Sequence, residues 1–167
     1  MKSTKEHKSV SWLTRQKPGL SNRGLSAIIL ALILTLLAPG CDKVSEDAAL
    51  VTRIIDGDTI EIEGGIRVRY IGIDTPEIGE PYYLEAKKAN RNLVGGTRIQ
   101  LEKDVQDKDE YGRLLRYVWV DGIMVNAELV RLGYAHSYSY PPNLRYQAHL
   151  LQLQREAREQ KQGLWSE

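Results

Sequence analysis

Cysteine is scarce in this sequence of 167 residues, where it occurs once, at Cys41. One thiol cannot form an internal disulfide or a thiolate metal cluster, so a metal ion would have to be bound by oxygen or imidazole. The sequence also lacks the broad excess of positive charge with which proteins hold duplex nucleic acid. Residues 1–40 carry six Lys and Arg against one acidic residue, but residues 41–167 carry 17 against 21. A polyanion would therefore have to be bound locally, by a few well-placed groups.

The N-terminal hydrophobic run is too short to span a bilayer. The uncharged stretch 25–38 has 14 residues, fewer than the roughly 20 that a membrane-spanning helix needs. Six basic residues precede it. This pattern is typical of a signal peptide, to which we assign residues 1–40.

The segment Leu37-Ala38-Pro39-Gly40-Cys41 resembles the lipobox of bacterial lipoproteins, because the only cysteine directly follows a small residue. The resemblance implies cleavage before Cys41, a lipid on that residue and attachment of the exported protein to the bacterial cell membrane. Residues 41–49 would then be the lipid-attachment site and an acidic tether, and residues 50–167 the folded domain. The alternatives are an exported protein that is soluble, either secreted or periplasmic, and retention of the uncleaved hydrophobic segment as an anchor.

Strand-like and helix-like patterns alternate along residues 50–167. Three runs rich in β-branched residues, separated by turn-forming Asp-Gly and Gly-Gly pairs, predict a meander of three strands. The expected strands cover residues 51–55, 59–63, 66–73, 97–103 and 114–120, and the expected helices cover residues 82–94, 124–132 and 144–162. Five short strands with a helix after the third predict a β-rich α+β fold, namely a five-stranded Greek-key barrel of the OB type with three α-helices.

The first candidate site is the acidic turn Asp56-Gly57-Asp58-Thr59. Two carboxylates at a tight turn are oxygen ligands that suit a hard cation such as Ca²⁺. On its own this pattern is weak, because Asp-Gly is also a common hairpin turn and a solvated turn would explain it.

A second cluster places a guanidinium, a strand and two more carboxylates within nine residues, through Arg69, Asp74 and Glu77. Arg69 could instead pair with a glutamate of the preceding strand, and Asp74 could cap the turn before Pro76. These roles explain each residue singly. They do not explain why carboxylates gather in two turns while arginines supply planar groups that match phosphate.

The third cluster is Tyr111-Gly112-Arg113, immediately before a strand, where the backbone positions the arginine. Together, Asp-Gly-Asp-Thr, Arg-x-x-x-x-Asp-Thr-Pro-Glu and Tyr-Gly-Arg, in this order and at these separations, resemble the thermonuclease (staphylococcal nuclease-like) family from about residue 51 to residue 167. The family's fold is similar to the one predicted above. The resemblance implies a hydrolase that cleaves DNA and RNA phosphodiester bonds with Ca²⁺ and leaves 3′-phosphate ends.

The same resemblance implies a metal site. Asp58 and Asp74 would be carboxylate ligands of Ca²⁺, and the backbone carbonyl of Thr75 would be a further ligand. Asp56 would lie just outside these ligands. Carboxylate and carbonyl oxygens are the ligands that Ca²⁺ prefers.

It also implies catalytic roles for three side chains. Arg69 and Arg113 would bracket the scissile phosphate, and Glu77 would position or deprotonate the attacking water. Because a phosphodiester is already anionic, nucleophilic attack requires that its growing negative charge be neutralised. A cation and two guanidinium groups meet that need, and a general base completes the chemistry.

For substrate binding, the resemblance implies a phosphate contact by Tyr111 and stacking of base and sugar on Tyr138 and Tyr140. Each of these tyrosines could also be a half-buried packing residue. Stacking requires exposed bases and tolerates any base sequence. We therefore expect single-stranded or frayed DNA and RNA as substrates, bound by a monomer.

An acidic run precedes this tyrosine cluster and consists of Asp104, Asp107, Asp109 and Glu110. Glu110 stands where the family often has a lysine, so substrate binding is expected to be weakened. His136 and His149 lie thirteen residues apart, and without a partner cysteine they do not predict a zinc site.

The alternative function is a non-catalytic OB-fold module that binds single-stranded nucleic acid without cutting it. Loss of an arginine or of the glutamate would favour that function. The sequence favours the enzyme, because it retains the whole set: Asp58, Arg69, Asp74, Glu77 and Arg113.

Overall fold

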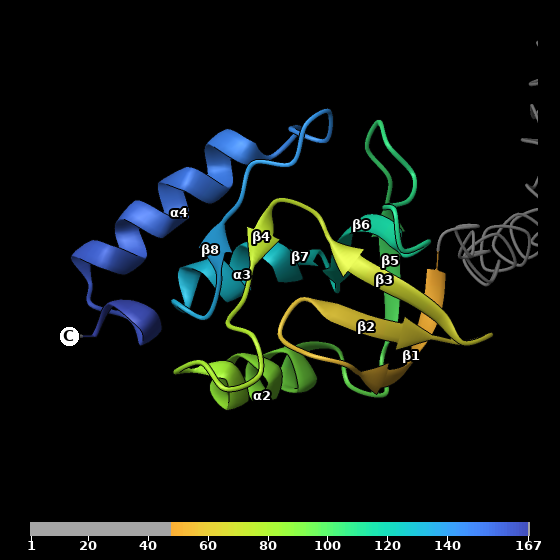
Figure 1. Cartoon of the computed structure of the whole chain (residues 1–167), viewed down its shortest axis with the longest axis horizontal. Helices are drawn as coiled ribbons and strands as arrows, with labels where there is room; N and C mark the ends of the chain where they lie inside the picture. Colours follow the sequence, from red (N-terminus) through yellow and green to blue (C-terminus); the bar gives the residue numbers. More distant parts are fainter. Residues whose placement is uncertain (1–47, 167) are drawn as a thin grey trace, which may run out of the picture. The chain divides into compact units, whose positions relative to one another are not determined.

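Five strands of the computed structural model, which describes residues 48–166, close into a barrel (Figure 1). They are β1 (Ala48–Ile54), β2 (Thr59–Ile62), β3 (Ile66–Tyr70), β5 (Arg98–Glu102) and β6 (Leu114–Val120). β1, β2 and β3 form an antiparallel meander, β5 joins it at β1, and β6 pairs with β5. A parallel pairing of β3 with β6 closes the barrel. The predicted five-stranded α+β barrel is therefore confirmed.

Three α-helices of the described chain pack on this barrel. They are α2 (Tyr83–Val94), α3 (Val125–Arg131) and α4 (Gln147–Glu159), and a short 3₁₀ helix, η1 (Gly163–Trp165), follows α4. The two-residue strand β7 (Ile123–Met124) pairs with β6 and leads directly into α3. In Figure 1, α2 and α4 lie on different sides of the molecule, with the short strands β4 (Ile73–Asp74) and β8 (His136–Ser137) between α4 and β3.

β3 serves both the core and the surface. Val68 and Tyr70 are buried, whereas Arg67 is exposed and Arg69 is half-buried. Successive side chains of a strand point to opposite faces, so the two arginines lie on one face and the two buried residues on the other. The strand therefore presents two arginine side chains on one face.

The strand expected over residues 66–73 is broken in two. β3 ends at Tyr70, and the chain resumes as β4 (Ile73–Asp74) after Gly72, which has a φ of +80°. Leu150 of α4 packs so closely here that a Cβ atom on Gly72 would lie 2.6 Å from its Cδ1 atom. Glycine is therefore required twice, by the backbone conformation and by the approach of α4.

The break redirects the chain out of the barrel. β4 pairs with β8 (His136–Ser137) as a separate two-stranded sheet and places Asp74 opposite His136. The loop that carries Tyr138 and Tyr140 follows β8 directly. One short ladder therefore brings the second acidic cluster and the tyrosine loop together.

The ends of β1 and of the last helix differ from the sequence prediction by up to three residues, whereas most other ends differ by at most one. β1 begins at Ala48, so the last two residues assigned to the tether belong to the first strand. The last helix begins at Gln147 instead of residue 144 and ends at Glu159 instead of residue 162. Two residues after its end, Lys161 adopts a left-handed φ of 52°. That conformation cannot continue a right-handed helix.

Two buried asparagines tie helices to the segments that carry candidate residues. Asn126 of α3 donates a hydrogen bond to the carbonyl of Ile71 at 2.9 Å. Asn90 of α2 donates to the carbonyl of Asp56 at 3.0 Å and accepts the hydroxyl of Tyr70 at 2.9 Å. The helices therefore fix the first acidic turn and the end of β3.

Residues 1–47 and residue 167 lie outside the described part of the chain. The predicted signal peptide and the lipid site at Cys41 fall among them. Of the helices in residues 48–166, none combines the length and the hydropathy needed to cross a bilayer.

Candidate active site

The two predicted acidic clusters meet at Asp58, whose side chain is only 7% exposed. Its Oδ2 atom accepts hydrogen bonds from the backbone N–H and the hydroxyl of Thr75, at 2.9 and 3.0 Å. Asp56 accepts the N–H of Asp58 at 3.0 Å within the same turn. Residues that are far apart in the sequence are therefore joined by buried hydrogen bonds.

Gly57 allows this junction. A Cβ atom at this position would lie 2.6 Å from the Oγ1 atom of Thr75. Any side chain would push the two turns apart, so the glycine in Asp-Gly-Asp-Thr serves a tertiary contact.

Arg69 connects the buried carboxylate to an exposed one. Its Nε lies 3.2 Å from Oδ1 of Asp58, and its Nη2 lies 2.8 Å from Oδ1 of Asp74. Its Nη1 donates to the carbonyls of Tyr70 and Ile73 at 2.9 and 2.8 Å. The guanidinium is therefore held in one orientation by both acidic turns and by the chain break after β3.

The glutamates of β2 and its turn, considered as alternative partners of Arg69, are engaged elsewhere. Glu61 pairs with Arg53 at 2.7 Å, and Glu63 lies 3.7 Å from Arg98. Arg69 is thus committed to the candidate site rather than to a pair across the sheet.

Burial dominates the electrostatics of Asp58. It raises the pKa of this carboxyl from 3.8 to about 6, although the Arg69 guanidinium acts in the opposite direction and Asp56 adds to the rise. Three carboxylates, those of Asp56, Asp58 and Asp74, thus share the neighbourhood of one arginine. Such an excess of negative charge favours a bound cation.

The donor set suits a hard cation. In the part of the chain that the structure describes, no three His, Cys, Asp or Glu side chains form a metal cluster by themselves. A cation at Asp58 and Asp74 would therefore complete its coordination with backbone carbonyls, such as that of Thr75, and with water. Such a donor set would consist of oxygen atoms alone, which suits a hard cation such as Ca²⁺ better than zinc.

Arg113 is positioned by Asp109, which in the sequence stands out only as one member of the acidic run. The Oδ2 atom of Asp109 lies 2.6 Å from Nε of Arg113, and its Oδ1 atom accepts the backbone N–H groups of Tyr111 and Arg113 at 3.0 and 2.9 Å. The Asp109 side chain is only 4% exposed. The Asp-x-x-Gly pattern of a turn was the available signal, because Gly112 has a φ of +78° and donates its N–H to the carbonyl of Asp109.

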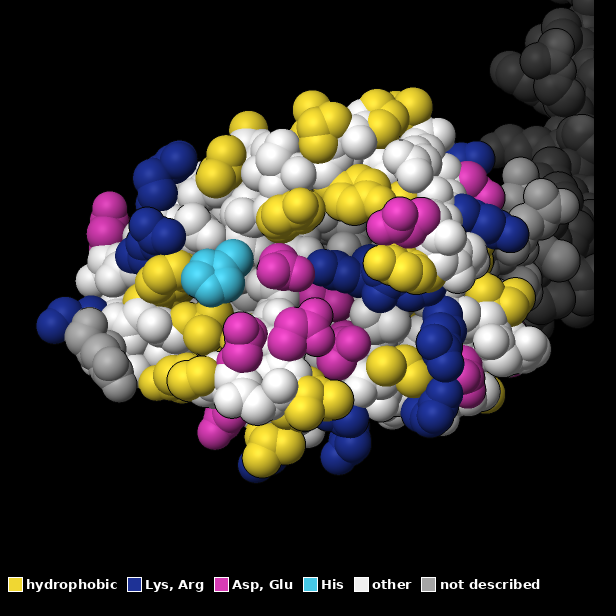
Figure 2. All heavy atoms as spheres, in the orientation of Figure 1, with side chains coloured by type: hydrophobic (Ala, Val, Ile, Leu, Met, Phe, Trp, Pro, Cys, Tyr) yellow, Lys and Arg dark blue, Asp and Glu magenta, His cyan; other side chains and the backbone are white. Residues whose placement is uncertain are grey.

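Arg69, Asp74 and Arg113 line one cavity of about 230 Å³. Tyr138 and Tyr140 line it as well, with ring centroids 6.5 Å apart and planes inclined by 52°. Figure 2 shows this face of the molecule, where Asp and Glu side chains gather beside a group of Lys and Arg side chains.

Five predicted site residues do not line this cavity, namely Asp56, Asp58, Thr75, Glu77 and Tyr111. Asp58 is linked to it through its contact with Arg69. Glu77 is exposed, and within residues 48–166 no hydrogen bond or ion pair engages its carboxylate; its N–H donates to Glu80 at 2.7 Å. Tyr111 is 76% exposed and lines a neighbouring cavity, with the Arg113 guanidinium 5.4 Å from its ring centroid. The structure therefore separates Tyr111 from the pair Tyr138 and Tyr140.

The rest of the acidic run also has structural partners. Asp107 pairs with Arg116 at 2.9 Å, and the Arg116 hydrogen bond lowers the pKa of Asp107. Asp104 accepts the hydroxyl of Tyr117 at 3.2 Å, and its Oδ1 atom lies 3.6 Å from Nη2 of Arg145. Most of this negative charge is neutralised within the protein, so it opposes a substrate less than the sequence implies.

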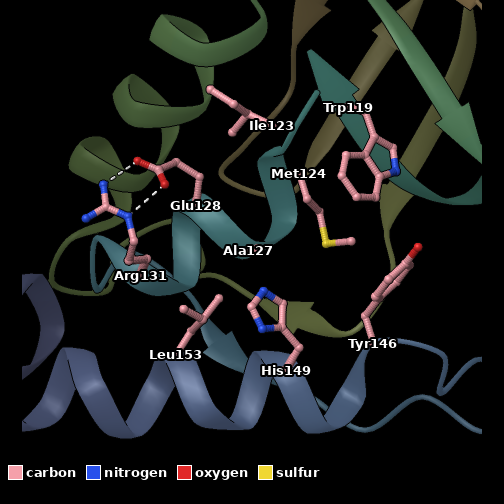
Figure 3. Close-up of a pocket in the computed structure, with 9 residues that line it drawn as sticks. All are labelled: Trp119, Ile123, Met124, Ala127, Glu128, Arg131, Tyr146, His149 and Leu153. Atoms are coloured by element: carbon pink, nitrogen blue, oxygen red, sulfur yellow. Dashed lines mark hydrogen bonds and ion pairs between the residues drawn. The ribbon is translucent and has the colours of Figure 1, made fainter. Parts of the chain in front are cut away.

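The two histidines lie apart. His136 in β8 packs edge-on against Trp165, with centroids 4.9 Å apart. His149 lies on α4 in a separate apolar cavity of about 470 Å³ between α3, α4 and β7 (Figure 3). That cavity shares no lining residue with the one that Arg69 and Arg113 line.

Fold and site together define a small OB-type barrel that presents arginines and carboxylates in one cavity. Residues 67–167 match the family described as Staphylococcal nuclease homologue. A thermonuclease of Staphylococcus hyicus is 33% identical over 162 residues, which cover 86% of this chain and 96% of that protein. A thermonuclease of Staphylococcus intermedius is 39% identical over 128 residues, which cover 71% of this chain and 76% of that protein. An SPbeta prophage-derived endonuclease of Bacillus subtilis is 42% identical over 125 residues, which cover 68% of this chain and 42% of that protein. The chain belongs to the staphylococcal nuclease homologue family.

Proposed function

We propose that this protein is a Ca²⁺-dependent nuclease that hydrolyses phosphodiester bonds of DNA and RNA and leaves 3′-phosphate ends. The observation that carries the proposal is the convergence of Arg69 and Arg113 on one cavity, with Asp58 and Asp74 bound to the first of them. The names of the relatives, thermonuclease and endonuclease, support the same class of reaction.

The two arginines have different parts in this proposal. Arg69 is bound on all three nitrogens and keeps the carboxylates in place at the edge of the cavity. Arg113 is held only through Nε, so its terminal nitrogens, which have no partner among the described residues, are available to phosphate oxygens. A fixed guanidinium that meets developing negative charge lowers the barrier to attack.

Asp58 and Asp74 would hold the cation, together with the carbonyl of Thr75, while Asp56 keeps the turn in shape. When bound, Ca²⁺ supplies positive charge that offsets the charge developing on the phosphate. Glu77 orients or deprotonates the attacking water. Its exposed carboxylate, without a protein partner among residues 48–166 and two residues after Thr75, supports that role.

Single-stranded or frayed nucleic acid is the proposed substrate. Tyr138 and Tyr140 line the cavity with tilted rings, and the exposed Tyr138 ring can stack on a base that is not paired. A monomer suffices, because all the proposed groups come from one chain.

The proposed location is the bacterial cell membrane, through a lipid on Cys41. The support is the sequence alone, in which a short hydrophobic run ends at the only cysteine. Two or more lipid chains would give stable attachment. Cys41→Ser should release the protein from the membrane fraction, and unchanged membrane partitioning of this variant would rule the lipid out.

The central experiment is a digest of end-labelled single-stranded DNA and RNA by the purified protein, with Ca²⁺ or with a chelator, followed by analysis of the product ends. Cleavage only with Ca²⁺ and 3′-phosphate ends are expected. Binding of single strands without cleavage in saturating Ca²⁺ would instead establish the non-catalytic binding module.

A further inference from the structure

A second cavity adjoins the candidate active site and, apart from Arg113, is built by different residues. It measures about 460 Å³ and lies between the turn that joins β2 to β3 and the loop that precedes β6. Arg113 lines both cavities, so they meet at the proposed phosphate contact. The lining residues are Gly65, Ile66, Arg67, Lys108, Tyr111, Gly112, Arg113 and Leu114.

This lining is strongly positive. Arg67, Lys108 and Arg113 contribute three cations, and no acidic residue of the described chain lines the cavity. Neither Arg67 nor Lys108 forms an ion pair within residues 48–166, whereas Arg53, Arg98 and Arg116 do. In Figure 2, dark blue side chains continue from the central acidic group toward the region where Figure 1 places β2 and β3. The cavity therefore offers unneutralised charge to an anion.

Arg67 and Lys108, which lack an ion-pair partner among residues 48–166, occupy fixed backbone positions. Arg67 lies opposite Glu61 in the strand ladder between β2 and β3, but the Glu61 carboxylate forms its ion pair with Arg53. Lys108 pairs with Leu114 in an isolated β-bridge. Neighbouring hydrogen bonds, from Leu115 N–H to the carbonyl of Asp107 at 2.9 Å and from Asp109 N–H to that of Arg113 at 3.1 Å, hold the same loop.

The spacing relates this cavity to the reaction site. Arg67 and Arg69 are two residues apart on one face of β3, so their Cα atoms are roughly 7 Å apart. Arg69 belongs to the first cavity and Arg67 to the second. A nucleic-acid strand whose bases stack on Tyr138 and Tyr140 can therefore pass Arg113 and continue along β3 toward Arg67.

We infer that the second cavity binds the phosphate of the neighbouring nucleotide in a single-stranded nucleic acid, through Arg67 and Lys108, on the side of the scissile phosphate away from Tyr138 and Tyr140. The inference rests on the proposed nuclease function and extends it to a longer stretch of substrate. The exposed ring of Tyr111 and the side chain of Ile66 give the sugar or base of that nucleotide an apolar surface. The two cations also supply positive charge near Glu110, which stands where the family often has a lysine.

Binding is tested first, without chemistry. The full-length protein is titrated in chelator against a fluorescent single-stranded oligothymidylate over a range of salt concentrations. Arg67→Ala and Lys108→Ala should each lower the slope of log K against log salt by about 0.7, and the double variant by about 1.4. Arg155→Ala, which removes an exposed cation from α4, is the matched control and should leave the slope unchanged.

Cleavage is tested next, in saturating Ca²⁺. Each substitution should raise KM roughly 3- to 10-fold and leave kcat unchanged, because the contact is the same in the ground state and the transition state. Arg67→Lys should recover part of the loss. With oligonucleotides that carry one neutral methylphosphonate linkage, the wild-type protein should lose affinity at the linkage next to the scissile one, and the double variant should not.

The outcomes separate this inference from the proposed function. If the wild-type protein cuts DNA and the Arg67 and Lys108 variants match it in KM and salt slope, the second cavity is not a phosphate subsite. If the wild-type protein does not cut at all, the proposed nuclease function fails, while the salt slopes in chelator still decide whether the cavity binds phosphate. Thermal melting of each variant confirms that the barrel is folded.

Discussion

Asp109 gives the sharpest test of how this site is assembled, because its buried carboxylate binds Arg113. Asp109→Asn keeps an oxygen that can accept the N–H groups of Tyr111 and Arg113, so the turn should persist. It replaces the oxygen that binds Nε of Arg113 with an NH₂ group, which cannot accept a hydrogen bond. The substitution therefore releases the guanidinium and little else.

The magnitude follows from the contact that is lost. The Nε to Oδ2 distance is 2.6 Å, and the two side chains are 27% and 4% exposed. A hydrogen bond between charged groups in such a setting contributes about 1.5–3 kcal/mol. If that energy holds Arg113 in its catalytic orientation, kcat should fall about 10- to 100-fold while KM changes little.

The assay is a set of initial rates over a range of single-stranded DNA concentrations in saturating Ca²⁺. Asp107→Asn is the matched control, because Asp107 lies in the same acidic run but pairs with Arg116 outside both cavities. A double variant with Arg113→Lys should be barely worse than Arg113→Lys alone, since both changes remove one interaction. A folded Asp109→Asn protein with wild-type kcat would refute the positioning role.

Three further predictions concern the chemistry. Arg113→Lys should lower kcat far more than it raises KM, because an ammonium keeps the charge but loses the planar two-pronged contact; steady-state rates measure this, and an effect on KM alone would contradict it. Glu77→Gln should cut turnover by about 10²- to 10⁴-fold and leave Ca²⁺ affinity nearly intact, which single-turnover rates and calcium titration can separate. Asp74→Asn should instead weaken Ca²⁺ binding first, because it removes a formal charge from the proposed ligands, and activity should recover at high Ca²⁺. Asp74→Asn with unchanged calcium dependence would exclude Asp74 as a ligand.

The barrel could be foreseen because the responsible signals are local, and the residues that line the cavity were recognisable as candidates for the same reason. Turn pairs mark the meander of β1, β2 and β3, and the clusters that contain Arg69, Asp74 and Arg113 each carry a recognisable pattern. The sequence places a glycine at position 72, but the extent of the break and the close packing of Leu150 of α4 against Gly72 could not be foreseen, because Leu150 lies far along the chain. A run of β-branched residues predicts a continuous strand until the partner that interrupts it is known.

Charge was the least predictable property of the site. The sequence gives the sign of each residue in the run from Asp104 to Glu110 but not its partner, and the structure assigns most of these carboxylates to Arg113, Arg116 and Tyr117. Arg67 shows the reverse case, since its strand neighbour Glu61 is already bound to Arg53. A count of charged residues therefore overstates the negative charge of the acidic run and understates the free positive charge at Arg67.

Closure of the barrel determines the spacing of the two candidate catalytic arginines. The parallel ladder between β3 and β6 sets Arg69 opposite Leu115, two residues after Arg113, so the distance between them is fixed by strand pairing rather than by a flexible loop. The pairing of β4 with β8 adds Asp74 and the tyrosine loop to the same edge. A substitution that loosens β3 against β6 should therefore disturb the carboxylates and Arg113 together, even where it touches neither. Charged groups stabilise a transition state only when the surrounding scaffold holds them in the correct geometry.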